Sequence, residues 1–194
     1  MTPFELDRQS LLILDKITAG ATAADLDRPT PCAGWTLADL LRHQISENHA
    51  FAEAARHGSA ADWESGELGA DAYTSYAASA EDFLQAFAED GVLARQLRIN
   101  TFGTFPGEVA AAMHLVDTVA HGWDLAKTLD VPYEPVPEAV TTALQFAAVI
   151  PADPEERKKN GTFAPLVAVP GDASELDRFL GLLGRDPGWA PQLT

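Results

Sequence analysis

The spacing of apolar residues restricts the fold of this chain more than any other feature, because it recurs with the period of an α-helix over long stretches. The spacing predicts helices over residues 4–20, 36–56, 74–97 and 108–129. No comparable stretch alternates apolar and polar residues as a half-buried β-strand requires. Amphipathic helices of this length bury their apolar faces against one another, so the sequence predicts an all-α fold, an up-down four-helix bundle.

Local signals mark the borders of these helices. Gly20 suits the end of the first helix, since glycine readily adopts the left-handed conformation found after many helix C-termini. Thr36, followed three residues later by Asp39, resembles a capping box at the start of the second helix. The segment NTFGTFPG is expected to be a short loop before the fourth helix, and the prolines of VPYEPVP end that helix.

The rest of the chain contains shorter pieces. The pattern predicts a helix over 137–150, a polar loop (PADPEERKKNG) and a last helix over 173–183. The prolines of FAPLVAVP favour an extended segment or a short edge strand over a central strand. These pieces are too small for a separate core, so we expect one domain over 1–194, a bundle core over about 1–130 and a C-terminal helical appendage over about 131–194.

The charge of the chain restricts its partners. Its 194 residues include 29 acidic and 13 basic side chains, for a formal net charge of −16. Such a charge repels phosphate backbones and anionic lipids, which argues against nucleic acid and membrane as partners. We expect a small-molecule substrate, and a homodimer is a further expectation, since small bundles often pair.

The N-terminus and the cysteine content suggest a compartment. The start, MTPFELDRQSLLILDK, lacks the basic residues and the cleavage site of a secretory signal. No apolar run approaches the roughly 20 residues that cross a bilayer. A single cysteine, Cys32, cannot form an internal disulfide. We therefore expect a cytoplasmic protein.

The fourth predicted helix contains three residues that can hold a metal ion. His114, Asp117 and His121 occur in MHLVDTVAHGWDL, and at about 100° per residue they lie within about 60° of one another around the helix. Asp117 and His121 can present a carboxylate oxygen and an imidazole nitrogen to one ion from successive turns. The same spacing also suits an exposed ion pair, so the pattern alone leaves both interpretations open.

A third donor is expected from a facing helix, because catalytic metal sites commonly use three protein ligands and keep one position open. His43 lies two turns into the second predicted helix, beside Leu41 and Ile45, so its imidazole can point into the bundle. A histidine among leucines is also common as an ordinary core residue. Two imidazoles and a carboxylate suit Zn²⁺, Ni²⁺ or Fe²⁺, and we expect Zn²⁺ first.

Three segments carry a resemblance to a known family: TPCAGWTLADLLRHQISENHAF, LVDTVAHGWDLAKTLD and DASELDRFLGLLGRDPGW. Together they resemble uncharacterised metal-binding proteins related to the metal-binding N-terminal domain of mycothiol-dependent maleylpyruvate isomerase, in the DinB-like superfamily. The resemblance spans nearly the whole chain. It implies a DinB-like four-helix bundle and, by position, the metal ligands His43, Asp117 and His121, with mycothiol or a similar thiol as a further cofactor.

Two departures from the isomerase limit what the resemblance implies. The isomerase carries an additional C-terminal domain that contributes to substrate binding, and the short tail of this chain has no obvious counterpart. Activity on maleylpyruvate itself is therefore not expected. The carboxylate ligand is also Asp117, which is shorter than the glutamate expected in the isomerase.

Other polar residues near these motifs have simpler interpretations. His114 is expected to orient Asp117 by a hydrogen bond, with a role as fourth ligand as the alternative. Glu47 is expected to be an exposed glutamate, with general base as the alternative. His49 and His57 are expected to face solvent.

The remaining candidates lie at helix ends and in loops. Trp35 and Trp123 are expected to be core anchors, or else walls of a pocket. Cys32 is expected to be a small apolar loop residue, since no catalytic base is evident nearby. In the GRDPGW tail, Arg185 and Asp186 are expected to pair with each other or with helix ends.

These observations lead to one main hypothesis and two alternatives. The main hypothesis is a metal-dependent enzyme, a thiol transferase or isomerase, that activates water or a low-molecular-weight thiol toward a small electrophile. The alternatives are a non-catalytic protein that binds a metal or small ligand, as a sensor or stress accessory, and a purely structural bundle.

Overall fold

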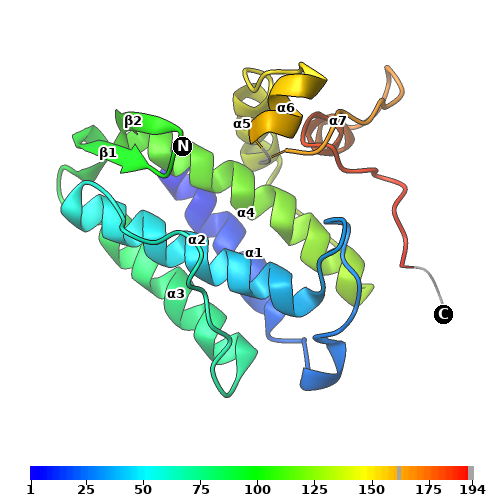
Figure 1. Ribbon diagram of the computed structural model, residues 1–194, viewed down its shortest axis with the longest axis horizontal. Helices are drawn as coiled ribbons and strands as arrows, with labels where there is room; N and C mark the ends of the chain where they lie inside the picture. Colours follow the sequence, from blue (N-terminus) through cyan, green and yellow to red (C-terminus); the bar gives the residue numbers. More distant parts are fainter. Residues whose placement is uncertain (161–162, 192–194) are drawn as a thin grey trace.

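A computed structural model describes residues 1–160 and 163–191 of the chain. These residues form a helical bundle, one small sheet and a C-terminal group of short helices (Figure 1). The bundle consists of α1 (Pro3–Thr18), α2 (Leu37–His57), α3 (Ala72–Phe87) and α4 (Gly107–Leu129). In the described part of the chain, no helix is both long and apolar enough to cross a membrane.

The four long helices surround a common core. α1 packs against α4 and α2 against α3, while contacts of α2 with α4 and of α1 with α3 close the ring. The core consists of residues such as Leu14, Leu40 and Phe83, all fully buried. The capping box predicted at Thr36 and Asp39 is present and starts α2. The predicted all-α bundle is therefore confirmed, with α2 and α4 placed within one residue of their predicted bounds.

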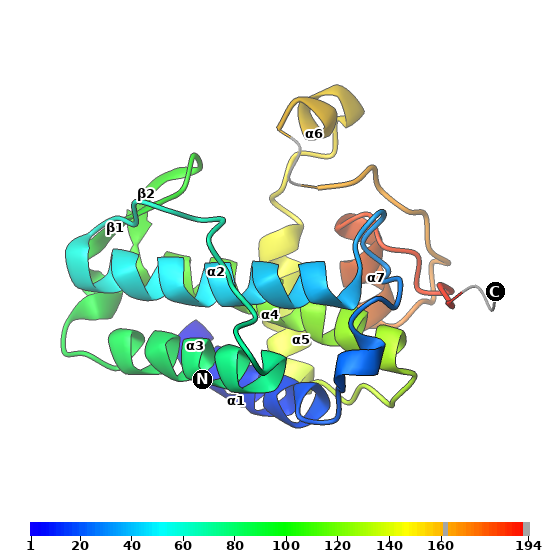
Figure 2. The same cartoon turned by 60° about the horizontal axis from the view of Figure 1, so that its bottom comes forward.

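The directions of the helices follow from contacts along them. His43 lies beside Asp117 and Asn48 bonds to His114, so α2 and α4 are antiparallel. The segment 58–71 runs back along α2, where its Gly66 N–H donates to Ser46. α3 consequently starts near the beginning of α2 and runs parallel to it (Figures 1 and 2). α1 is parallel to α4, because Asp7 pairs with His114 and Leu14 lies beside Gly122. From α1 to α4 the order of directions is therefore up, down, down, up, which refines the predicted topology.

The third helix and the loop after it differ from prediction. The helix predicted over 74–97 ends at Phe87, and Gly91, with φ of 78°, leads into a 3₁₀ turn (η2, Val92–Ala94). The predicted loop NTFGTFPG belongs to an antiparallel hairpin of β1 (Gln96–Ile99) and β2 (Gly103–Pro106). Strands of four residues are too short for a clear alternating pattern, which is why the sequence did not indicate them.

The C-terminal part forms a second hydrophobic cluster on the outer face of α4. This C-terminal part of the chain contains the helices α5 (Pro137–Ala147), α6 (Pro154–Asn160) and α7 (Glu175–Leu182). α6 lies where a polar loop was predicted, and the Asp153 side chain accepts hydrogen bonds from its first turn. The run FAPLVAVP forms neither a helix nor a strand in the described part of the chain. The short 3₁₀ turn η1 (Ala23–Asp25) precedes α2.

Candidate metal centre

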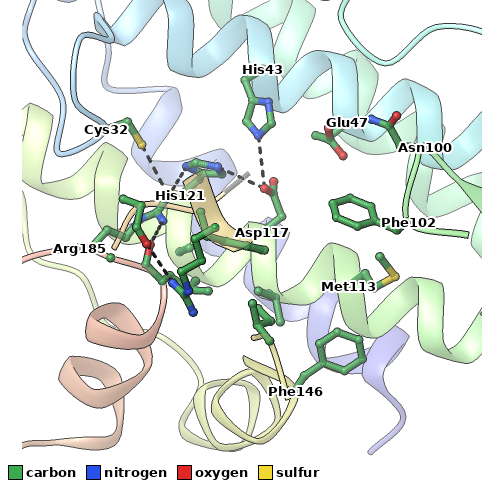
Figure 3. Close-up of a pocket in the computed structure, with 18 of the residues that line it drawn as sticks. Cys32, His43, Glu47, Asn100, Phe102, Met113, Asp117, His121, Phe146 and Arg185 are labelled. Carbon is green, nitrogen blue, oxygen red and sulfur yellow. Dashed lines mark hydrogen bonds and ion pairs between the residues drawn. The ribbon is translucent and has the colours of Figure 1, made fainter. Parts of the chain in front are cut away.

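The three predicted ligands lie together between α2 and α4. Asp117 Oδ1 is 3.3 Å from His43 Nε2 and 3.2 Å from His121 Nε2. The donor atoms of the three side chains all lie within 4.8 Å of one another (Figure 3). This spacing allows one ion to contact all three donors after small side-chain rotations, so the donor set fits a divalent metal.

The helices explain this convergence. His43 projects from α2 across the gap to α4, while its neighbours Leu40 and Leu41 are fully buried in the bundle core. Asp117 and His121 stand one turn apart on α4. The ring of Trp35 lies edge-on to His43 at 5.2 Å between centroids and stacks on His121 at 6.4 Å. Trp35 therefore walls the site, whereas Trp123 is buried in the second hydrophobic cluster.

The charges of the cluster balance one another. Burial would raise the pKa of Asp117, but His121 and His43 hold that pKa well below its usual value. Burial would lower the pKa of His121, but Asp117 and Asp124 hold it well above the usual value. Gln44 Nε2 also donates to Asp117 Oδ2. The raised pKa of His121 favours its protonated form beside the Asp117 carboxylate, and a bound metal cation would replace that positive charge.

Asp124 fixes the far side of His121 and was not identified from the sequence. Its Oδ2 lies 2.8 Å from His121 Nδ1, and Arg185 Nη2 donates to the same oxygen at 2.9 Å. Although burial acts to raise it, Arg185 and His121 lower the pKa of Asp124 to about 2. An ionised Asp124 accepts a hydrogen bond from the His121 Nδ1–H and leaves Nε2 directed at the cluster. Its position three residues after His121 was the available sequence signal.

The same contacts test two expectations. Arg185 forms its ion pair with the buried Asp124 rather than with Asp186, and it also donates to the Leu183 carbonyl group at the end of α7, as one of the predicted alternatives had it. Cys32 is not an isolated apolar residue, because its Sγ donates to Asp124 Oδ2 at 3.3 Å and lies 3.6 Å from Arg185 Nη2. Cys32, His121 and Asp124 form a second group with metal-ligand spacing. A cation held there would face the Arg185 guanidinium, so the group containing His43 is the better site.

Glu47 and His114 differ from their predicted roles. Glu47 is half-buried and lines the cavity beside the cluster, rather than facing solvent. Burial and the Asp117 charge raise the pKa of Glu47 to about 8. His114 is 1% exposed and lies 2.6 Å from Asp7 and 3.0 Å from Asn48, so it does not orient Asp117. His49 and His57 are exposed, as predicted.

A cavity of about 900 Å³ opens from the cluster. It extends toward the hairpin, which contributes Phe102 and Phe105, and toward the end of α5, which contributes Phe146. Most of its walls are apolar, and its polar lining includes His43, Asp117 and His121. A cavity with apolar walls and a few converging polar groups is typical of a small-molecule site.

Comparison with known proteins extends these observations. Residues 8–126 match the family described as the mycothiol maleylpyruvate isomerase N-terminal domain. Two uncharacterized proteins of Mycobacterium tuberculosis, from two strains, are each 26% identical to this chain over 169 residues, covering 87% of this chain and 90% of the relative.

A solved structure has a similar fold. The crystal structure of the mycothiol-dependent maleylpyruvate isomerase superposes with a TM-score of 0.69 at 13% identity, covering 96% of this chain and 89% of that chain. The similarity therefore continues beyond the bundle into the C-terminal part. This corrects the expectation that the tail of this chain has no counterpart there.

Proposed function

The chain belongs to the family of the mycothiol maleylpyruvate isomerase N-terminal domain, and from this relationship we propose that it is a metal-dependent enzyme acting on a small electrophile. His43, Asp117 and His121 are the proposed ligands of one divalent ion. A low-molecular-weight thiol resembling mycothiol is the proposed second reactant, with water as the alternative. The reaction is a thiol transfer or an isomerisation.

The observation that carries this proposal is the convergence of three donor atoms within 4.8 Å at the wall of a large cavity. Two imidazoles and one carboxylate leave coordination positions open, which distinguishes catalytic from structural zinc sites. The cavity volume of about 900 Å³ suits a drug-sized ligand, so a thiol and a small electrophile can be accommodated together.

Each neighbouring side chain has a defined part in the proposal. A bound divalent ion supplies Lewis acidity and lowers the pKa of a thiol or water. Asp124 holds the His121 tautomer, and Gln44 holds one oxygen of Asp117. Glu47, facing the cavity one turn after His43, is the proposed acceptor for a proton that the thiol or the substrate releases.

The ligand set leaves Zn²⁺, Ni²⁺ and Fe²⁺ as candidates, and Zn²⁺ is our first expectation. Asp117, whose side chain is shorter than that of a glutamate, would hold a bound ion through its carboxylate together with His43 and His121.

The test is the metal content of protein purified without a histidine tag, measured by elemental mass spectrometry. We expect about one transition-metal ion per chain, lost in His43→Ala and His121→Ala, since three protein ligands are the common minimum for such a site. His49→Ala is the matched control, because His49 lies elsewhere on α2, is exposed and pairs with Asp82 of α3. It should keep the metal.

A further variant separates the two possible ligand groups. Cys32→Ala should retain the metal if His43, Asp117 and His121 bind it, and should lose the metal if Cys32, His121 and Asp124 do. Absence of metal in the wild-type protein, even after reconstitution, would overturn the proposal. Metal without any thiol-dependent turnover would instead indicate a non-catalytic binding protein.

A further inference from the structure

The cavity beside the cluster has two chemically different ends. α2 lines it with His43, Glu47 and then Phe51, each one turn after the previous residue. The antiparallel α4 lines it in the matching order with His121, Asp117 and then Met113. Both helices therefore change from polar to apolar in the same direction, away from the candidate metal ligands.

The apolar end is completed by side chains from outside the bundle. Figure 3 shows Phe102, from the hairpin turn, and Phe146, from α5, near Met113 and away from Cys32 and Arg185. Phe102 is 48% exposed, and Val149 in the same lining is 75% exposed. Large apolar side chains gathered and exposed around a cavity are typical of a surface that binds an apolar ligand.

The charges in the lining oppose an anionic ligand. Arg185 is paired with the buried Asp124. The Arg157 guanidinium donates to the backbone carbonyl groups of Pro151, Ala164 and Leu182. Both arginines of the described lining are thus engaged.

The Glu47 side chain also supplies no positive charge to an anionic ligand. The Glu47 carboxyl lines the cavity and has no hydrogen-bond partner among the residues that the structure describes. The whole chain carries a net charge of −16. Even with one carboxylate of a dicarboxylate at the candidate metal site, the other would lose its hydration without gaining a free arginine or lysine from this described lining, which is unfavourable.

We propose that the substrate of this site is an uncharged aromatic molecule, whose ring lies between Phe102, Met113 and Phe146 and whose reacting group points toward Asp117. Aromatic rings and a thioether bind a planar apolar ring through dispersion and edge contacts. This proposal rests on the proposed function, because the bound molecule is a substrate only if the protein is an enzyme. It differs from a preference for the dicarboxylate maleylpyruvate, which the name of the structurally similar isomerase gives as the substrate of that protein.

A binding experiment on metal-free and zinc-loaded protein tests the proposal without an activity assay. N-phenyl-1-naphthylamine, an uncharged fluorescent probe, is titrated into the protein, and nitrobenzene or maleate is then added as competitor. We expect the probe to bind and nitrobenzene to displace it at concentrations at which maleate does not. Phe102→Ala should weaken probe binding by about tenfold, because it removes one apolar wall of the cavity.

Two further variants make the test specific. Val149→Asp places a charge in the lining at an exposed position and should also weaken probe binding. Leu12→Ala is the matched control, because Leu12 is 55% exposed on α1 and does not line the cavity. It should leave binding unchanged.

The outcomes distinguish this proposal from the proposed function. Displacement by maleate at lower concentrations than by nitrobenzene, failure of the probe to bind, or equal effects of Phe102→Ala and Leu12→Ala would each overturn it. If the protein binds metal and prefers maleate, the metalloenzyme proposal is kept and the aromatic-substrate proposal fails. If the probe binds but the protein holds no metal even after reconstitution, the cavity binds aromatic molecules and the metalloenzyme proposal fails.

Discussion

At the scale of single residues, the Asp124 carboxylate joins the bundle to the C-terminal segment. It is fully buried and accepts hydrogen bonds from Cys32 and Arg185, and it also pairs with His121. A buried carboxylate is stable only when its charge is compensated and its oxygens are hydrogen-bonded. The orientation of the candidate metal ligand His121 on α4 therefore depends on an arginine 64 residues further along the chain.

We predict that Arg185→Met destabilises the protein by about 3 kcal/mol, because it removes one partner of a buried ion pair while His121 still compensates part of the charge. The measurement is urea unfolding followed by circular dichroism. Arg178→Met is the matched control, since the Arg178 side chain is 47% exposed and pairs with an exposed Glu175. An equal effect of both substitutions would contradict the role of the buried pair.

At the scale of elements, the start of α4 is fixed by close contact with the 3₁₀ turn η2. Gly107, the first residue of α4, donates its N–H to the Arg95 carbonyl group at 2.8 Å. A Cβ at this position would lie 2.2 Å from the Val92 carbonyl oxygen. This contact sets the position of the adjoining hairpin, which carries Phe102 to the cavity.

We predict that Gly107→Ala destabilises the protein by about 2 kcal/mol, because the added methyl group overlaps backbone atoms that cannot move independently. Gly171→Ala is the control, since a Cβ there meets no atom within 4 Å. Thermal unfolding of the two variants gives the comparison. A Gly107→Ala protein as stable as the Gly171→Ala protein would show that η2 and α4 can separate at little cost.

At the scale of the whole molecule, two hydrophobic clusters share α4. One face of α4 contributes Ala110, Ala111 and Leu125 to the bundle core. Its other face contributes Leu115 and Val119 to the cluster that also contains α5 and α7. Because both clusters include α4, loosening one should loosen the other, and we expect the chain to unfold as a single cooperative unit.

We predict that Phe179→Ala, in α7, lowers the unfolding temperature of the whole molecule by about 10 °C, since replacing a buried phenylalanine typically costs about 3–5 kcal/mol. Calorimetry and circular dichroism should show one coincident transition in both proteins. A separate transition at lower temperature for the C-terminal part, with the bundle unaffected, would contradict the coupling through α4.

The sequence alone determined the features that depend on neighbouring residues. The bounds of α2 and α4 follow from local apolar spacing and, for α2, from the cap at Thr36, so they could be predicted to within one residue. The placement of Asp117 and His121 on one face of a helix is equally local. His43 could be named as a candidate partner from its place two turns into a facing helix, but the choice between a metal ligand and an ordinary core histidine came from the family resemblance.

Only the tertiary structure decided the features that depend on distant contacts. The parallel direction of α3, the hairpin, the burial of Glu47 and the pairing of Arg185 with Asp124 each join segments that share no local periodicity. A side chain's charge state and exposure depend on what packs against it, and a one-dimensional pattern does not contain that information. The local sequence therefore specified which residues could act, while long-range packing specified which of them meet at the cavity and how their charges are compensated.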